Sequence, residues 1–385
     1  MNKKTISVIL SVLFAGILTG CNAISAAEPE NINLAEKPAV TTTAAKTPVS
    51  NTITFSAAEP EITITKGGSY TVTGSVKNGR LIISAGNEAV TLTFKDADIT
   101  SERGPALRIR SAKSVEVVLP KDTDSFLTSS TRDDDSAAIA SNAELTISGE
   151  GSLTLSSNGS GIDTNKVLNM KGGSLTVSKS EEGIEAAEVN VTDGNITITS
   201  REDGINALRQ YSQSGGRVYI DCGGEGLDSR IYVSGGSLII EGTRGLPIEF
   251  EREFEITGGT IFTTGSTFGS GRNVFPTGGD QTFVAANVSA GIDDVISVKD
   301  SKGNDVASLV AAKKTSVIFV SNAALKAGET YTITVTDSET ETTAATVKAG
   351  EKPATQTSPR YDDDDDWDDR YDDDYYDDDR YDWDD

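Results

Sequence analysis

Between Ile139 and Thr263 the chain repeats one short pattern six times, and this repeat limits the possible folds more than any other feature. Each copy holds a Gly-Ile or Gly-Leu step, two short alternating segments and a recurrent glycine between them. The copies return about every 22 residues, a spacing typical of solenoids, whose single repeats are too small to bury their own apolar side chains.

The apolar residues of each copy are spaced two apart on both sides of the recurrent glycine. The glycines are Gly151, Gly173, Gly194, Gly216, Gly236 and Gly259. Two and four places after them come Leu153 and Leu155, Leu175 and Val177, Ile196 and Ile198, Val218 and Ile220, Leu238 and Ile240, and Ile261 and Thr263. A spacing of two puts these side chains on one face of a strand. A β-sandwich of hairpins also alternates, but it does not return each glycine to the same phase. We therefore predict an all-β fold, a parallel β-helix of about 22 residues per coil.

The composition removes several kinds of chemistry. The chain has no His, which excludes a serine triad and the commonest general base and zinc ligand. Catalysis would have to depend on carboxylates, Lys, Arg or Tyr.

The first 21 residues have the pattern of an export signal. Lys3 and Lys4 precede an apolar run from Ile6 to Leu18 that is too short to span a bilayer. The ending Leu18-Thr19-Gly20-Cys21 resembles a lipoprotein lipobox, so we expect lipidation of Cys21 and an extracytoplasmic protein anchored to a membrane or cell surface. The alternative is a secretory signal cleaved after Ala26 or Ala27. With Cys21 lipidated, Cys222 has no disulfide partner.

The two flanking segments lack apolar periodicity. Residues 22–50, rich in Ala, Thr and Pro, are expected to form a flexible stalk. Residues 350–385 form an acidic tail whose last part, 361–385, carries 16 Asp and 2 Arg, so it contributes −14 of the net charge of −25. Such mutual repulsion predicts a disordered tail.

Between stalk and tail we expect two regions. Residues 51–279 form the β-helix domain, with irregular coils from Thr52 to Leu119 and a polar loop from Lys121 to Ser136, whose Asp133–Asp135 run is either solvated or a cation ligand. Residues 280–349 form a β-rich segment that either extends or caps the stack.

Four copies place acids beside the Gly-Ile or Gly-Leu step. One column is Ser160, Glu182, Asp203 and Glu225, and the other is Asp163, Glu185, Asn206 and Asp228. Stacked carboxylates about 5 Å apart repel each other by about 1 kcal/mol or more. Calcium would offset this repulsion because it binds several oxygens in loose geometry, with Asp203 near the best centre. The alternative is a ladder of acids that splay into water.

A second outward column lies three places after the recurrent glycine. It ends in Tyr219, Ile239 and Phe262, and with Tyr232 on a neighbouring strand its rings could stack on the apolar faces of sugars. Burial under the C-terminal segment is the alternative interpretation.

The segment Ala137–Ser141, followed by Glu144–Thr154, resembles the bacterial carbohydrate-binding-domain proteins, which are similar in fold to β-helical pectate lyases. The acid-Gly-Ile repeats and the closing segment 321–331 also resemble this family. The resemblance covers about Thr52 to Val335. It implies a right-handed parallel β-helix, calcium between coils at the acids named above, and a polysaccharide of pectin or cellulose type. Here Glu185 precedes Ala186-Ala187-Glu188 where the family often has Gly-Lys-Asp, so fewer ligands are expected per site.

The leading hypothesis is a non-catalytic, surface-anchored polysaccharide-binding protein with calcium between its coils. We expect a monomer without a nucleic-acid partner. A calcium-dependent pectate-type lyase is the first alternative, with Lys166, Arg209 or Arg230 as the candidate base. A structural or adhesive surface solenoid is the second.

Overall fold

The structure of the protein is a computed structural model that describes residues 51–353 except 59, 132–135, 244–246, 251 and 269–273. The described residues form strands, turns and loops, and none of their segments is a helix that could cross a membrane. The predictions for Cys21, the stalk, Asp133–Asp135 and the acidic tail lie outside this part of the chain.

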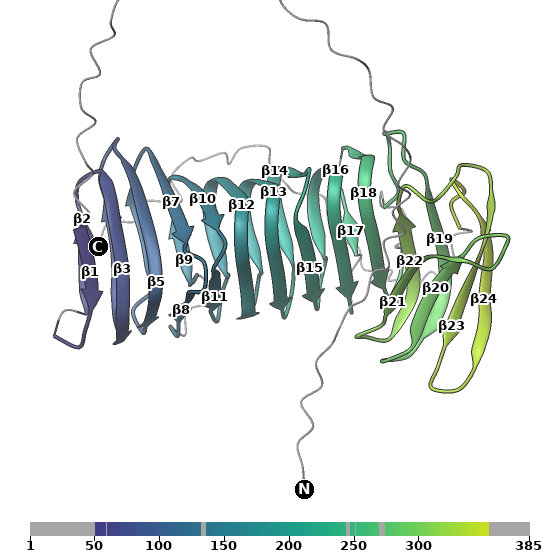
Figure 1. The fold of residues 1–385 in the computed structure, drawn as a ribbon, viewed down its shortest axis with the longest axis horizontal. Coiled ribbons are helices and arrows are strands. Elements are labelled where there is room, and N and C mark those ends of the chain that lie inside the picture. The colour runs from purple at the N-terminus through teal and green to yellow at the C-terminus, as the bar shows by residue number, and fades with distance from the viewer. Residues whose placement is uncertain are drawn as a thin grey trace, which may run out of the picture. The chain divides into compact units, whose positions relative to one another are not determined.

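The body is a β-solenoid of about nine turns, roughly 22 residues apart, and Figure 1 shows its successive strands side by side. Each turn adds one strand segment to each of three parallel ladders, which we name face 1, face 2 and face 3. In-register pairing of like positions gives the stacking that the repeat predicts.

Face 1 consists of short strands and of the first residues of long ones. In order they are β2 (Glu61–Ile64), β4 (Arg80–Ser84), β6 (Leu107–Ser111), β9 (Ile139–Ser141), the starts of β12 (Ile162–Ser180), β13 (Ile184–Ser200), β14 (Ile205–Gln213) and β16 (Leu227–Gly242), and β17 (Ile248–Glu249).

Faces 2 and 3 continue each coil. Face 2 contains β1 (Asn51–Phe55), β3 (Gly68–Lys77), β5 (Ala89–Ser101), β7 (Ser114–Leu119), β10 (Glu144–Gly149), the later parts of β12, β13, β14 and β16, and the start of β18 (Phe254–Gly265). Face 3 contains the ends of β3 and β5, β8 (Asp124–Ser129), β11 (Ser152–Ser156), the ends of β12 and β13, β15 (Arg217–Cys222), and the ends of β16 and β18.

The interior is a continuous aliphatic stack. All the residues two and four places after the recurrent glycine, from Leu153 to Thr263, are at most 1 % exposed. Burying one such Leu, Ile or Val side chain contributes about 1.5–3 kcal/mol, so the stack is held by the sum of many equivalent contacts. Cys222 is a free, buried thiol.

One predicted loop contains a strand. Lys121–Ser136 is not wholly irregular, because β8 pairs with β5 on one side and β11 on the other. β8 lacks the usual alternation of buried apolar and exposed polar residues. Its Phe126 points outward, while Ser125 and Ser129 are buried beside Leu127.

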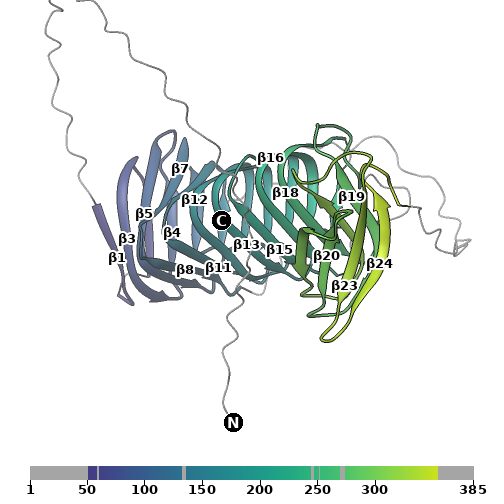
Figure 2. The ribbon, with the colours of Figure 1, turned by 45° about the vertical axis from the view of Figure 1, so that its right-hand side comes forward.

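The C-terminal segment both extends and covers the solenoid. β22 (Thr315–Ser321) pairs antiparallel with β18, and β19 (Phe283–Ala290) pairs antiparallel with β22, so face 3 gains two strands. A separate antiparallel sheet follows, β20 (Val295–Lys299), β21 (Asp305–Val310), β23 (Thr330–Thr336) and β24 (Glu341–Lys348), visible beside the last coils in Figure 2. This sheet shares an apolar cluster with the outer side of β16 and β18.

The interior stack ends in aromatic side chains. Phe254 packs against Phe319 at 6.0 Å between ring centroids, and Phe319 stacks on Phe283 at 5.2 Å. Phe275 stacks in turn on Phe283 at 5.7 Å. These rings cover the last aliphatic layer, so the open end of the solenoid is shielded from water.

Candidate functional site

The predicted acids do form two stacked columns, which together we call the acidic edge. On face 1, Asp163, Glu185, Asn206 and Asp228 are paired in register from coil to coil, and Glu249 continues the column. At the preceding corner, the amide of Gly183 donates to the carbonyl of Asp203 at 2.9 Å, and Gly204 donates to Glu225 at 2.8 Å. Ser160, Glu182, Asp203 and Glu225 therefore also follow one another along the stack.

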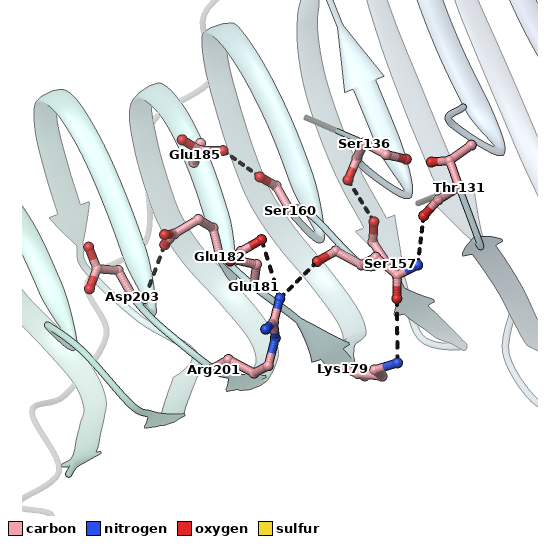
Figure 3. Close-up of polar contacts among 11 residues, drawn as sticks. Thr131, Ser136, Ser157, Ser160, Lys179, Glu181, Glu182, Glu185, Arg201 and Asp203 are labelled. Carbon is pink, nitrogen blue, oxygen red and sulfur yellow. Dashed lines mark hydrogen bonds and ion pairs between the residues drawn. The ribbon is translucent and has the colours of Figure 1, made fainter. Parts of the chain in front are cut away.

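The corner acids bind the backbone of the next coil, a role that the sequence did not reveal. Glu182 Oε2 accepts the amide of Asp203 at 3.0 Å, and Asp203 Oδ1 accepts the amide of Glu225 at 2.7 Å. In the coil before, the Ser160 hydroxyl donates to Glu185. Figure 3 shows Ser160, Glu182, Glu185 and Asp203 on successive corners. Each acid thus links two coils as well as carrying charge.

Burial, with neighbouring negative charge, raises the pKa of two carboxyl groups of this edge. Burial, then the neighbouring charge of Asp203, raises the pKa of Glu182 to about 7, although its hydrogen bond from the Asp203 amide opposes the shift. Burial also raises the pKa of Asp203. The folded protein therefore holds protons on this edge more tightly than an unfolded chain does.

Stability without added cations should therefore fall as the pH rises from about 4.5 to about 7, the ordinary and raised pKa values of Glu182. Above that window Glu182 is charged in both states and the loss is complete. We expect the Tm in a chelating buffer to be a few degrees lower at slightly alkaline than at mildly acidic pH. In Glu182→Gln, whose amide oxygen still accepts the Asp203 amide, the difference should shrink; in the exposed control Glu150→Gln it should not. Equal pH profiles for both variants would contradict this account.

The donor chemistry of the edge suits calcium, but its side chains do not converge. Carboxylate and amide oxygens are the ligands that calcium prefers, and burial, together with neighbouring negative charge, raises the pKa of Glu182 and Asp203. Among the described residues, no group of three or more acidic, His or Cys side chains surrounds a single point where a metal could be held. Calcium therefore stays a prediction.

Basic and amide side chains lie beside the acidic edge, at the end of face 3. Arg201 forms an ion pair with Glu181 at 3.3 Å and contacts the carbonyl of Asn158 at 3.5 Å, while Lys179 contacts Asn158 Oδ1 at 3.5 Å. Figure 3 shows Lys179 and Arg201 on this side of the corner. Positive and negative side chains therefore lie next to each other beside the acidic edge.

The predicted sugar platform of Tyr219, Tyr232 and Phe262 is wrong as an exposed surface. Phe262 is only 3 % exposed, because the C-terminal sheet covers it together with Ile239. Tyr219 packs against the same cluster and donates its hydroxyl to Glu241 at 2.9 Å. Tyr232 lies on face 2, away from the other two, and its hydroxyl donates to Glu253. For Phe262 and Tyr219 the structure shows the alternative interpretation, packing under the C-terminal segment, whereas Tyr232 stays partly exposed.

The uncovered part of the same column carries an aromatic ring that the sequence analysis missed. Phe126 is 44 % exposed and stands in register with Thr154, Thr176 and Thr197. We call these four residues the face 3 strip. The ring could have been found if β8 had been recognised as a strand. The position of β8 that pairs with Thr154 of the next coil is Phe126.

The comparisons with known proteins agree with the predicted resemblance. The family profile described as carbohydrate-binding domain-containing protein matches residues 58–357. A protein of that description from Acetivibrio thermocellus is 29 % identical over 188 residues, which is 46 % of this chain and 66 % of the relative's length. A solved structure of a polysaccharide lyase-like protein from C. thermocellum, a gadolinium derivative, is 24 % identical with a TM-score of 0.43, over 56 % of this chain and 94 % of that one. Because the profile extends over most of the described residues, the chain belongs to the family of carbohydrate-binding domain-containing proteins.

Proposed function

We propose that the protein is a non-catalytic polysaccharide-binding protein whose glycan lies along the face 3 strip. The observation that carries this proposal is the in-register row of Phe126, Thr154, Thr176 and Thr197. An exposed ring offers an apolar surface to a pyranose face, and the threonine hydroxyls both donate and accept hydrogen bonds. Because the row is straight and repeats with the coils, it suits an extended polymer better than a compact small molecule.

Calcium at the acidic edge is part of the proposal. Asp163, Glu182, Glu185, Asp203, Asn206, Glu225 and Asp228 are the residues that would hold it. Bound there, the cation would neutralise the edge and offer an open coordination position to a sugar oxygen or carboxylate. The residues' own part is to space the oxygens evenly and to link adjacent coils through the backbone hydrogen bonds of Glu182 and Asp203.

Binding is better supported than elimination chemistry. Arg209 forms an ion pair with Glu188 at 2.9 Å, and Arg230 with Glu253 at 3.5 Å. Each guanidinium already binds a carboxylate, and guanidinium groups in general are poor bases, so neither arginine suits proton abstraction from a sugar. The lipid on Cys21 and the location outside the cytoplasm are proposals from residues 1–21 alone, and mass spectrometry of the N-terminal peptide tests them.

Calorimetric titration of the full chain with neutral and uronic oligosaccharides, with calcium and with chelator, tests this function. Phe126→Ala should weaken binding of the neutral oligosaccharide by about two- to tenfold, because aromatic stacking contributes about 0.5–1.5 kcal/mol. Leu208→Ala, which removes a side chain 79 % exposed on another part of the surface, is the matched control and should bind like the wild type. Equal affinity of both variants would remove the face 3 strip from the site. A steady rise in absorbance from an unsaturated product would instead identify a lyase.

A further inference from the structure

Four arginines gather on face 1 near the N-terminal end of the solenoid, where Arg108 stands in the same column as Asp163, two coils before it. Arg80, Arg103, Arg108 and Arg110 come from β4, the turn before β6, and β6 itself. Arg108 and Arg110 are two apart on β6 and so point to the same outer side. We call these four residues the arginine cluster.

Coil stacking places the arginine cluster beside a hollow. Arg108 is in register with Ile82 of the preceding coil, and Ile82 is in register with Thr63. Thr63 is one wall of an open hollow of about 630 Å³ that is lined by Ala58, Pro60, Glu61, Ile62, Thr63 and Arg103. Its volume is within the range of about 300–1,000 Å³ found for small-ligand sites.

The arginine cluster is positively charged within an acidic protein. Glu61 accepts two hydrogen bonds from Arg80, at 2.7 and 3.0 Å, and lies 3.8 Å from Arg103. Arg80 also donates to the carbonyl of Arg103 at 3.0 Å, which fixes the two residues together. Burial, and then the charges of Arg110 and Arg80, lower the pKa of Arg108. An anion bound beside these guanidinium groups would interact favourably with their charges.

The chemistry of the ligand follows from these groups. Guanidinium forks bind oxyanions, such as carboxylates and sulfates, through paired hydrogen bonds. Pro60 and Ile62 give the hollow an apolar wall, and Thr63 adds a hydroxyl. A sugar ring with one anionic substituent satisfies both parts: the ring enters the hollow and its oxyanion faces the arginines.

We propose that the hollow and the arginine cluster form a second, calcium-independent subsite for a carboxylate- or sulfate-bearing unit of a polysaccharide. This inference rests on the proposed polysaccharide-binding function and adds to it. The net charge of −25 repels anionic polymers from most of the surface. The subsite explains how an anionic glycan can still bind, at one end of the solenoid and without a bridging cation.

The test is titration of the full chain, in chelator and low salt, with a uronic, a sulfated and a neutral oligosaccharide of equal length. Arg103→Gln/Arg110→Gln should lose at least about tenfold in affinity for the anionic ligand, because two charge-assisted contacts are removed. Arg209→Gln removes an equally exposed guanidinium elsewhere and should leave that affinity unchanged. The two anionic ligands show whether carboxylate or sulfate is preferred, and added salt should weaken both.

The outcomes separate this inference from the function on which it rests. If the double variant keeps the wild-type affinity for anionic ligands, or if both variants lose it equally, the subsite is wrong while binding at the face 3 strip stands. If the wild type binds none of the oligosaccharides with or without calcium, the proposed function itself fails. If a single-stranded DNA of matched charge binds the arginine cluster more tightly than either glycan, the ligand class is wrong. Unchanged Tm values for the variants are needed to attribute the losses to binding.

Discussion

Gly183→Ala is expected to lower the free energy of unfolding by at least about 3 kcal/mol, the upper end of what overpacking costs. A Cβ at this position would lie 2.1 Å from the carbonyl oxygen of Gly204 and 2.5 Å from a methyl group of Ile198. The first obstacle is the backbone of the next coil, so no change of rotamer removes the clash. Relief requires the coils to separate, and this breaks the hydrogen bond from Ile184 to Gly204 at 3.0 Å.

Gly242→Ala is the matched control because it adds the same methyl group to the same solenoid. Its nearest neighbour would be 3.5 Å away, at ordinary contact distance. We expect a change within about 0.5 kcal/mol, as for substitutions that break no specific feature. Urea unfolding followed by far-UV circular dichroism measures both. Equal midpoints for the two variants would show that neighbouring coils do not need a glycine at the corner.

The corner glycines show where a correct sequence pattern had an incomplete physical reason. Glycine at a tight corner commonly adopts a positive φ that other residues avoid, but none of Gly161, Gly183, Gly204 and Gly226 has a positive φ. Their role is the close approach of successive coils, which leaves no space for a Cβ. The recurrent glycines after Gly151 are different: Gly194, for example, has a φ of 86°, a region that favours glycine.

The stacked layers could be predicted because alternation and a fixed period are local properties of the sequence. Leu175 and Ile196 lie two places after a glycine, and both are in the core and paired in register. The strand β8 was not recognised because its largest apolar residue, Phe126, points outward, while Ser125 is buried and its hydroxyl oxygen accepts the Ala97 amide at 3.1 Å. An alternation pattern fails where a buried position is polar and satisfied by a hydrogen bond.

The acidic edge was predicted in position but not in its contacts. Stacking alone places Glu182 and Asp203 on successive corners, so their mutual repulsion could be expected from the sequence. That each carboxylate also accepts a backbone amide of the next coil depends on the exact path of the corner. The arginine cluster was missed for a related reason: Arg80 and Arg108 are 28 residues apart in sequence and meet only through the register of β4 and β6.

Phe262→Ala is expected to lower the free energy of unfolding by about 3–5 kcal/mol, as deletion of a buried aromatic ring usually does. Phe262 is in register with Ile239 on one side and Val320 on the other, and all three belong to the cluster under the C-terminal sheet. The cavity would weaken the attachment of β20–β24 to the last coils. Hydrogen exchange should therefore rise first in β18 and β22, while the coils from β9 to β13 stay protected.

Phe126→Ala, in the same outward column as Phe262, is expected to affect sugar affinity rather than stability. Its ring is 44 % exposed against 3 % for Phe262, so its removal should change stability by less than about 1 kcal/mol while reducing affinity for the neutral oligosaccharide. Phe262→Ala should keep wild-type affinity at temperatures where it is folded. The two variants thus separate a ring that faces ligand from one that faces the chain's own sheet. A stable Phe262→Ala protein that no longer binds sugar would show instead that the C-terminal sheet opens to admit the glycan.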